Sequence, residues 1–192
     1  TKAGPVPIVP AAIIYDLWLG KPSWPGAQAG YFAAASASAD FTCGSVGAGT
    51  GATVGKFLGE ERATKAGVGT ACLTGAGGLV VGALAVVNAL GNVVEPESGK
   101  VVAGARLNDG AFASARLLYT AERWRGSFMN TTLVVVGTNA VLSRSEAYRV
   151  AQMAQDGLAL TVRPAHTLYD GDTIFCVATG KLQADPNLVG IM

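Results

Sequence analysis

Apolar blocks along this chain predict strands more often than helices. The run Leu133 to Val136 is aliphatic and β-branched, which is typical of a strand buried on both faces. The block Leu79 to Val94 reads as two strands joined by a Leu-Gly-Asn turn, and a turn over 95–100 precedes a further apolar stretch. An Asp-Gly turn followed by residues 173–180 predicts a final buried strand. We therefore expect a strand-rich, mixed α/β domain.

Helical patterns are fewer. Residues 143–162 have a Ser143/Ser145 start, an early Glu146 and helically spaced apolar positions, and they predict the best helix of the chain. The small residues of 27–41 predict a tightly packed helix, and 110–126 a partly helical connection. Three prolines keep the first residues extended.

Composition narrows the function classes. The chain has 192 residues, of which 50% are hydrophobic and 14% charged, so one domain with a substantial core is expected. A net charge of +1 without a basic run excludes the usual signature of nucleic-acid binding. Three widely spaced cysteines predict neither a metal site nor a disulfide framework, and they favour a reduced, cytoplasmic setting. We expect no cofactor.

One segment permits a membrane interpretation. From Ala66 to Val94 the chain carries no charge and is apolar enough to suggest a membrane helix. Its many glycines and valines favour core strands instead, so we expect no membrane association.

Three motifs allow a purely structural interpretation as well as a functional one. Residues 47–52, GAGTGA, loosely match a dinucleotide-binding fingerprint, but they lack a preceding strand and a later acidic partner, so a flexible surface loop is predicted. The lone His166 is expected to be structural. Asp170 and Asp172 form either an ordinary Asp-Gly turn or a coupled acidic pair.

The polar entrance to the strand at Leu133 is unusual. Asn130, Thr131 and Thr132 form a local turn in the simplest reading. Alternatively, the chain is cut before Thr131, and the new α-amine acts as the base for the Thr131 hydroxyl. That arrangement needs no histidine and requires a rigid element, which a buried strand provides. The residues alone leave both readings open.

A resemblance covering nearly the whole chain favours the second reading. The segments GPVPIVPAAIIYDL, GATVGK, GALAVVNALGNVV, AGAR, NTTLVVVGTNAVLS and HTLYDGDTIFCVATG occur in this order. Together they resemble the family of DmpA-type D-amino-acid and β-peptide aminopeptidases, which also contains endo-type nylon-oligomer hydrolases. These N-terminal nucleophile hydrolases cleave themselves into α and β chains. The resemblance implies a layered α-β-β-α sandwich, and it predicts one domain, 1–192, cut into 1–130 and 131–192.

The resemblance also implies the site residues. Thr131 matches the nucleophile, and Asn130–Thr131 matches the self-cleavage bond. Asn88 matches the oxyanion-stabilising asparagine, and Tyr15 an active-site tyrosine. Lys56 matches a lysine of the nylon-oligomer branch. Asp170 and Asp172 match the acidic pair that tunes the nucleophile.

The function expected from this resemblance is that of a self-processing amidohydrolase. Thr131 and Lys56, with the two aspartates, resemble the branch that cleaves linear aliphatic oligoamides, with small peptides as further substrates. The alternatives are an aminopeptidase for D- or β-amino-acid peptides, an uncut scaffold without activity, and, less well matched, an acetyl-transferring relative. The family implies a homo-oligomer of α/β heterodimers. Its members extend further at both ends, so we expect this chain to be part of a longer protein.

Overall fold

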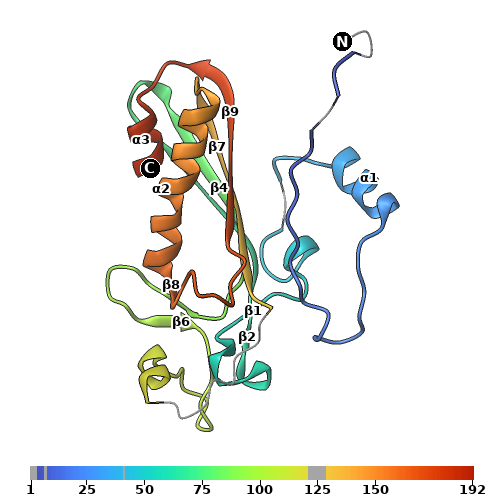
Figure 1. Cartoon of the computed structure of the whole chain (residues 1–192), viewed down its shortest axis with the longest axis vertical. Helices are drawn as coiled ribbons and strands as arrows, with labels where there is room; N and C mark the ends of the chain where they lie inside the picture. Colours follow the sequence, from blue (N-terminus) through green and yellow to red (C-terminus); the bar gives the residue numbers. More distant parts are fainter. Residues whose placement is uncertain (1–3, 7, 41, 121–128) are drawn as a thin grey trace.

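The computed structural model describes residues 4–6, 8–40, 42–120 and 129–192, and its secondary structure is mixed α/β (Figure 1). The fold class predicted from the sequence is therefore confirmed. The α-helices are α1 (Ala27–Ala35), α2 (Arg144–Thr161) and α3 (Pro186–Ile191). The strands are β1 (Thr53–Val54), β2 (Thr64–Lys65), β3 (Gly67–Thr74), β4 (Val80–Asn88), β5 (Asn92–Val94), β6 (Val101–Ala103), β7 (Thr131–Ala140), β8 (Val162–Arg163) and β9 (Thr173–Leu182). Short 3-10 helices include η2 (Lys56–Leu58) and η5 (Ala115–Tyr119).

The largest sheet has four strands in the order β3-β4-β7-β9. Neighbours are antiparallel except β7 and β9, which run parallel because α2 lies in the crossover between them. In this register, Asn88 at the end of β4 lies opposite Thr131 at the start of β7. The uncharged segment 66–94 supplies β3, β4 and β5, and no helix among the described residues is long and apolar enough to cross a membrane.

Helices α2 and α3 cover one face of this sheet (Figure 1). Helix α2 begins at a capping box in which the Ser143 hydroxyl accepts from the Glu146 N–H and the Glu146 carboxylate accepts from the Ser143 N–H, as the sequence predicts. Val150 of α2 and Val189 of α3 pack against Val136 of β7 in the main hydrophobic core. Together they make one helical layer and one sheet layer.

The opposite face of the sheet is partly exposed. Val135 in β7 is 40% exposed and Val177 in β9 is 54% exposed, whereas Val136 is buried. The predictions that residues 133–136 are buried on both faces and that the last strand is buried are therefore wrong for this chain. Side chains alternate along a strand, and the helices cover one set of them. β9, in addition, is an edge strand.

Smaller elements surround the N-terminal end of β7. The hairpin β5–β6 turns through 95–100 and pairs with β8, while β1 pairs with β2. Phe57, Leu90, Ala105 and Ala113 form a separate core cluster there. Helix α1 forms as predicted, but none of its residues is buried and it lies apart from the sheet (Figure 1). The expected tight packing of this helix is therefore wrong.

The partly helical connection predicted over 110–126 is present as η5, as far as the structure describes it. Residues 121–126 of that prediction lie outside the described residues.

Candidate active site

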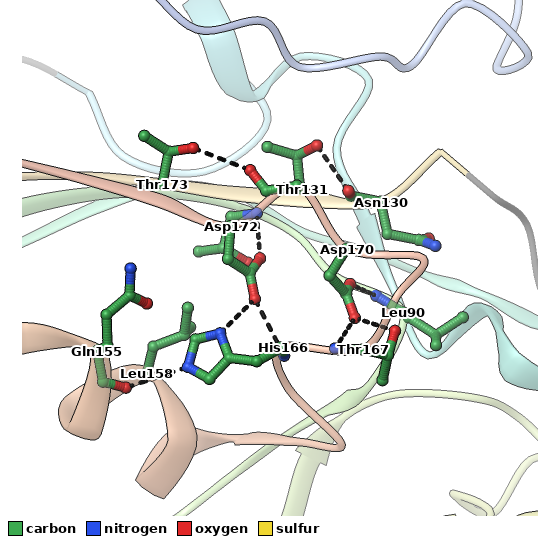
Figure 2. A network of polar contacts seen from close by, with 12 residues as sticks. Leu90, Asn130, Thr131, Gln155, Leu158, His166, Thr167, Asp170, Asp172 and Thr173 are labelled. Carbon is green, nitrogen blue, oxygen red and sulfur yellow. Dashed lines mark hydrogen bonds and ion pairs between the residues drawn. The ribbon is translucent and has the colours of Figure 1, made fainter. Parts of the chain in front are cut away.

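The site begins with Thr131 and the peptide bond before it. Thr131 is the first residue of β7, and its Oγ1 donates to the carbonyl oxygen of Asn130 at 2.6 Å. The Gly171 N–H donates to the same oxygen at 2.7 Å (Figure 2 shows Thr131, Asn130 and the loop beside them). A Cβ at position 171 would lie 3.1 Å from Thr131 Oγ1, so a glycine allows the loop to approach this closely. The Asn130 carbonyl therefore accepts from a hydroxyl and from an amide.

Asn88 lies across the sheet from Thr131 and is fully buried. Its Oδ1 accepts from Lys56 Nζ at 2.7 Å and from the Thr53 N–H at 3.1 Å. These two donors fix the amide so that its Nδ2 points the other way, where it donates to the Tyr15 carbonyl oxygen at 3.1 Å. The arrangement holds an amide N–H group rigidly beside the start of β7.

Lys56 is fully buried, and its Nζ also donates to the Asn88 carbonyl oxygen at 2.9 Å. Burial lowers the pKa of Lys56 from 10.5 to about 8, and the nearby carboxylates of Glu60, Asp170 and Asp16 oppose that shift. The ammonium thus lies near acidic groups. It binds Asn88, which lies opposite Thr131 in the sheet. Lys56 is therefore not an ordinary solvated lysine of the protein surface.

The surface loop predicted for residues 47–52 is present only in its first part, where Gly47, Ala48 and Thr50 are exposed. The following residues, 51–57, which include Lys56, are all buried. Gly55 has a φ of +76°, and a Cβ there would overlap the backbone of Ala105, so its glycine permits a close crossing of two chain segments. The glycines serve packing, and they bring Lys56 under the end of β4.

The two aspartates bind different parts of the chain (Figure 2). Asp170 Oδ1 accepts from the Leu90 N–H at 3.2 Å, and its Oδ2 accepts from the Thr167 hydroxyl at 2.6 Å and the Thr167 N–H at 3.2 Å. Asp172 Oδ1 accepts from the Thr132 N–H at 2.8 Å. Asp172 therefore bonds to the residue that follows Thr131, whereas Asp170 fixes its own loop to the turn after β4.

Among the residues predicted from sequence, Tyr15 contributes differently from expectation. Its backbone carbonyl meets Asn88, while the residue as a whole is 41% exposed. Two groups near the site were not predicted from the sequence to take part in it. One is the Gly171 N–H, which no sequence pattern identifies. The other is His166, expected to be structural, whose Nδ1 lies 3.1 Å from Asp172 Oδ2. Its only sequence signal is its place four residues before Asp170.

A cavity of about 530 Å³ lies elsewhere, between the sheet and helices α2 and α3. Apolar side chains dominate its lining, and Thr132 is the residue it shares with the surroundings of Thr131. Neither Thr131, Asn88 nor Lys56 lines it. Within the described residues, no group of three or more His, Cys, Asp or Glu side chains is placed to hold a metal ion.

Comparison with known proteins places this geometry in context. Residues 1–190 match the model of peptidase family S58. The uncharacterized aminopeptidase Rv1333 of Mycobacterium tuberculosis is 43% identical over 195 residues, which cover 96% of this chain and 54% of the relative. The uncharacterized aminopeptidase ML1167 of Mycobacterium leprae is 41% identical over 198 residues, covering 94% and 52%. The chain thus spans about half the length of these relatives.

Solved structures also match. The PH0078 protein of Pyrococcus horikoshii OT3 aligns with a TM-score of 0.55 at 25% identity, over 80% of this chain and 37% of that one. A β-aminopeptidase of Burkholderia sp. aligns with a TM-score of 0.50 at 28% identity, over the same shares of the two chains. Both alignments include most of this chain but little more than a third of the chain in the solved structure.

Proposed function

Because this chain belongs to peptidase family S58, we propose that it is the catalytic part of a self-processing aminopeptidase with Thr131 as its nucleophile. The observation that carries this proposal is the environment of the bond before Thr131. The hydroxyl of Thr131 lies 2.6 Å from the Asn130 carbonyl oxygen, and the Gly171 N–H donates to that oxygen. A nucleophile and an oxyanion donor therefore meet at one peptide bond.

Self-cleavage follows from this geometry. Thr131 Oγ adds to the Asn130 carbonyl carbon, and the negative charge that develops on the carbonyl oxygen is stabilised by the Gly171 N–H. The C–N bond then breaks, its nitrogen takes up the proton that the Thr131 hydroxyl has released and becomes the α-amine of Thr131, and an ester joins Asn130 to Thr131 Oγ. Water hydrolyses the ester and leaves an Asn130 carboxylate and a free N-terminal threonine.

Turnover uses the same nucleophile once the amine is free. An α-amine has an ordinary pKa near 8, so its neutral form accepts the proton of the Thr131 hydroxyl as that hydroxyl attacks a substrate amide. An amide nitrogen carries two N–H groups, so Asn88 Nδ2 can donate to Tyr15 and to an oxyanion at the same time. The Lys56 ammonium beside Asn88 favours the developing negative charge and the neutral amine.

The relatives favour an aminopeptidase over the oligoamide hydrolase expected from sequence. Those we compared from Mycobacterium carry the name aminopeptidase, and a matching structure is a β-aminopeptidase. We therefore propose small peptides with a free N-terminus, β-amino-acid peptides among them, as substrates. A linear aliphatic oligoamide is the second candidate, because the buried Lys56 beside Asn88 matches the lysine of the nylon-oligomer branch. Product analysis with a free aminoacyl amide and a capped oligoamide distinguishes the two.

Denaturing mass spectrometry of the full-length protein tests self-cleavage directly. We expect a break between Asn130 and Thr131 in the wild type, one intact and inactive chain for Thr131→Ala, and slower processing for Thr131→Ser, which keeps a hydroxyl. The adjacent Thr132→Ala is the matched control, because it removes a neighbouring hydroxyl that makes no hydrogen bond in the structure. This control should still cleave. An intact, active wild type, or cleavage by Thr131→Ala, would refute the proposal, and an intact, inactive wild type would support the uncut scaffold.

A further inference from the structure

His166 makes three contacts that converge on the acidic side of the site (Figure 2). Its ring Nδ1 lies 3.1 Å from Asp172 Oδ2, and its backbone N–H donates to the same oxygen at 3.3 Å. Its ring Nε2 lies 3.4 Å from the carbonyl oxygen of Gln155 in α2. Both ring nitrogens therefore face acceptors. A neutral imidazole has one N–H and satisfies one of them, whereas an imidazolium donates to both.

The backbone of His166 is held in an uncommon conformation. Its φ is +56°, the left-handed region, and it is the one residue other than glycine with positive φ among the described residues. Such conformations persist where the surrounding structure imposes them, and they concentrate at functional sites. Here the conformation lets the N–H and the ring of one residue reach the same carboxylate oxygen.

The other oxygen of that carboxylate faces the nucleophile strand. Asp172 Oδ1 accepts from the Thr132 N–H at 2.8 Å, and the Asp172 side chain is only 5% exposed. Each oxygen of Asp172 thus has its own function. One is bound by His166, and the other binds the residue directly after Thr131.

We propose that His166 is a positioning residue for Thr131. It fixes Asp172 from the side of α2, and Asp172 in turn fixes the backbone at Thr132, so that the Thr131 hydroxyl stays against the Asn130 carbonyl. The inference rests on the proposed self-cleavage, because the rate of that step is what the positioning serves. His166 touches neither Thr131 nor the bond that breaks, and it acts through Asp172.

The rate of self-cleavage in newly synthesised full-length chains tests this inference. His166→Gly removes the ring and keeps the backbone N–H, and glycine adopts a φ of +56° without strain. We expect cleavage to slow by about 10- to 100-fold, the rate equivalent of one charge-assisted hydrogen bond. Leu168→Gly is the matched control. It adds the same backbone freedom to the same loop at a fully exposed side chain, and it should cleave at the wild-type rate.

A double-mutant cycle separates positioning through Asp172 from a general structural role. If His166 acts through Asp172, adding His166→Gly to Asp172→Asn should slow cleavage no further than Asp172→Asn alone. His166→Asn should recover part of the lost rate, because asparagine tolerates the left-handed region and keeps a side-chain donor. Free imidazole should likewise accelerate the His166→Gly chain, since the ring it replaces is partly open to solvent.

The outcomes that overturn this inference differ from those that overturn self-cleavage. Cleavage of His166→Gly at the wild-type rate, or a double variant whose loss is the product of the two single losses, contradicts the role of His166 while leaving self-cleavage intact. A full-length wild-type chain that stays in one piece refutes self-cleavage, and the inference with it. If His166→Gly does not fold, the rate of His166→Asn decides: cleavage slower than in the wild type supports the proposal, and cleavage at the wild-type rate contradicts it.

Discussion

The two neighbours of β7 hold their polar groups near Thr131 in opposite ways. On the β4 side, Lys56 and Asn88 are fully buried and bind each other through side chains. On the β9 side, Asp170 and Asp172 are bound mostly by backbone N–H groups, two of them, those of His166 and Thr167, from their own loop. A buried ammonium loses hydration, which lowers its pKa, whereas local N–H groups replace the hydration of a carboxylate. Folding thus costs free energy on the β4 side, where Lys56 loses its hydration. On the β9 side, hydrogen bonds from nearby N–H groups compensate for the lost hydration of the carboxylates.

The largest effect expected on either side of β7 is a loss of kcat when Asn88 is replaced. Asn88→Ala removes the proposed oxyanion donor, so kcat should fall by about 100- to 1,000-fold while KM changes little. Steady-state kinetics of the processed enzyme measures this. Asn92→Ala is the matched control, since Asn92 is also a buried amide but binds Ala105 and Ala113 away from the site. It should lower stability without a comparable loss of kcat in the folded fraction. A rise in KM alone for Asn88→Ala would assign Asn88 to substrate binding.

A smaller effect is expected in the pH dependence of stability at Lys56. Its folded pKa of about 8 lies below its ordinary 10.5, so between these values the unfolded chain holds a proton that the folded chain has lost. The free energy of unfolding of the wild type should therefore rise with pH over this window, relative to Lys56→Met. The total gain is about 3 kcal/mol. Denaturant unfolding of both proteins at several pH values measures it, and parallel curves would contradict a buried, desolvated Lys56.

The smallest effect concerns the β9 side. Asp170→Asn leaves a donor facing the N–H of Leu90 or the N–H and hydroxyl of Thr167, so we expect the free energy of unfolding to fall by about 1–3 kcal/mol. Asp172→Asn should affect kcat more strongly, because Asp172 binds Thr132 next to the proposed nucleophile. Thermal melting together with kinetics of both variants separates the two aspartates. If both variants lost kcat equally and kept the stability of the wild type, the two aspartates would share one catalytic function.

The sequence predicted what is local and failed where distant segments meet. Helix α2 was predictable because Ser143 and Glu146 cap it within one turn. The burial of residues 51–57 was not predictable, because it depends on the approach of Gly55 to the backbone at Ala105, some fifty residues away. The contact of His166 with Gln155 likewise depends on how the loop returns to α2, which no residue pattern encodes. The resemblance, in contrast, named the residues Lys56 and Asn88 that the structure brings together.

The register between β4 and β7 has a mechanical consequence for a chain cut before Thr131. Eight residue pairs, from Val81 opposite Thr138 to Asn88 opposite Thr131, join a strand of the first fragment to a strand of the second. The pairing of β5 with β8 joins the fragments a second time. Breaking the one covalent bond before Thr131 leaves these strand pairings intact. The two fragments would therefore stay associated until the sheet unfolds. Fragments produced separately are expected to reassociate into the same structure.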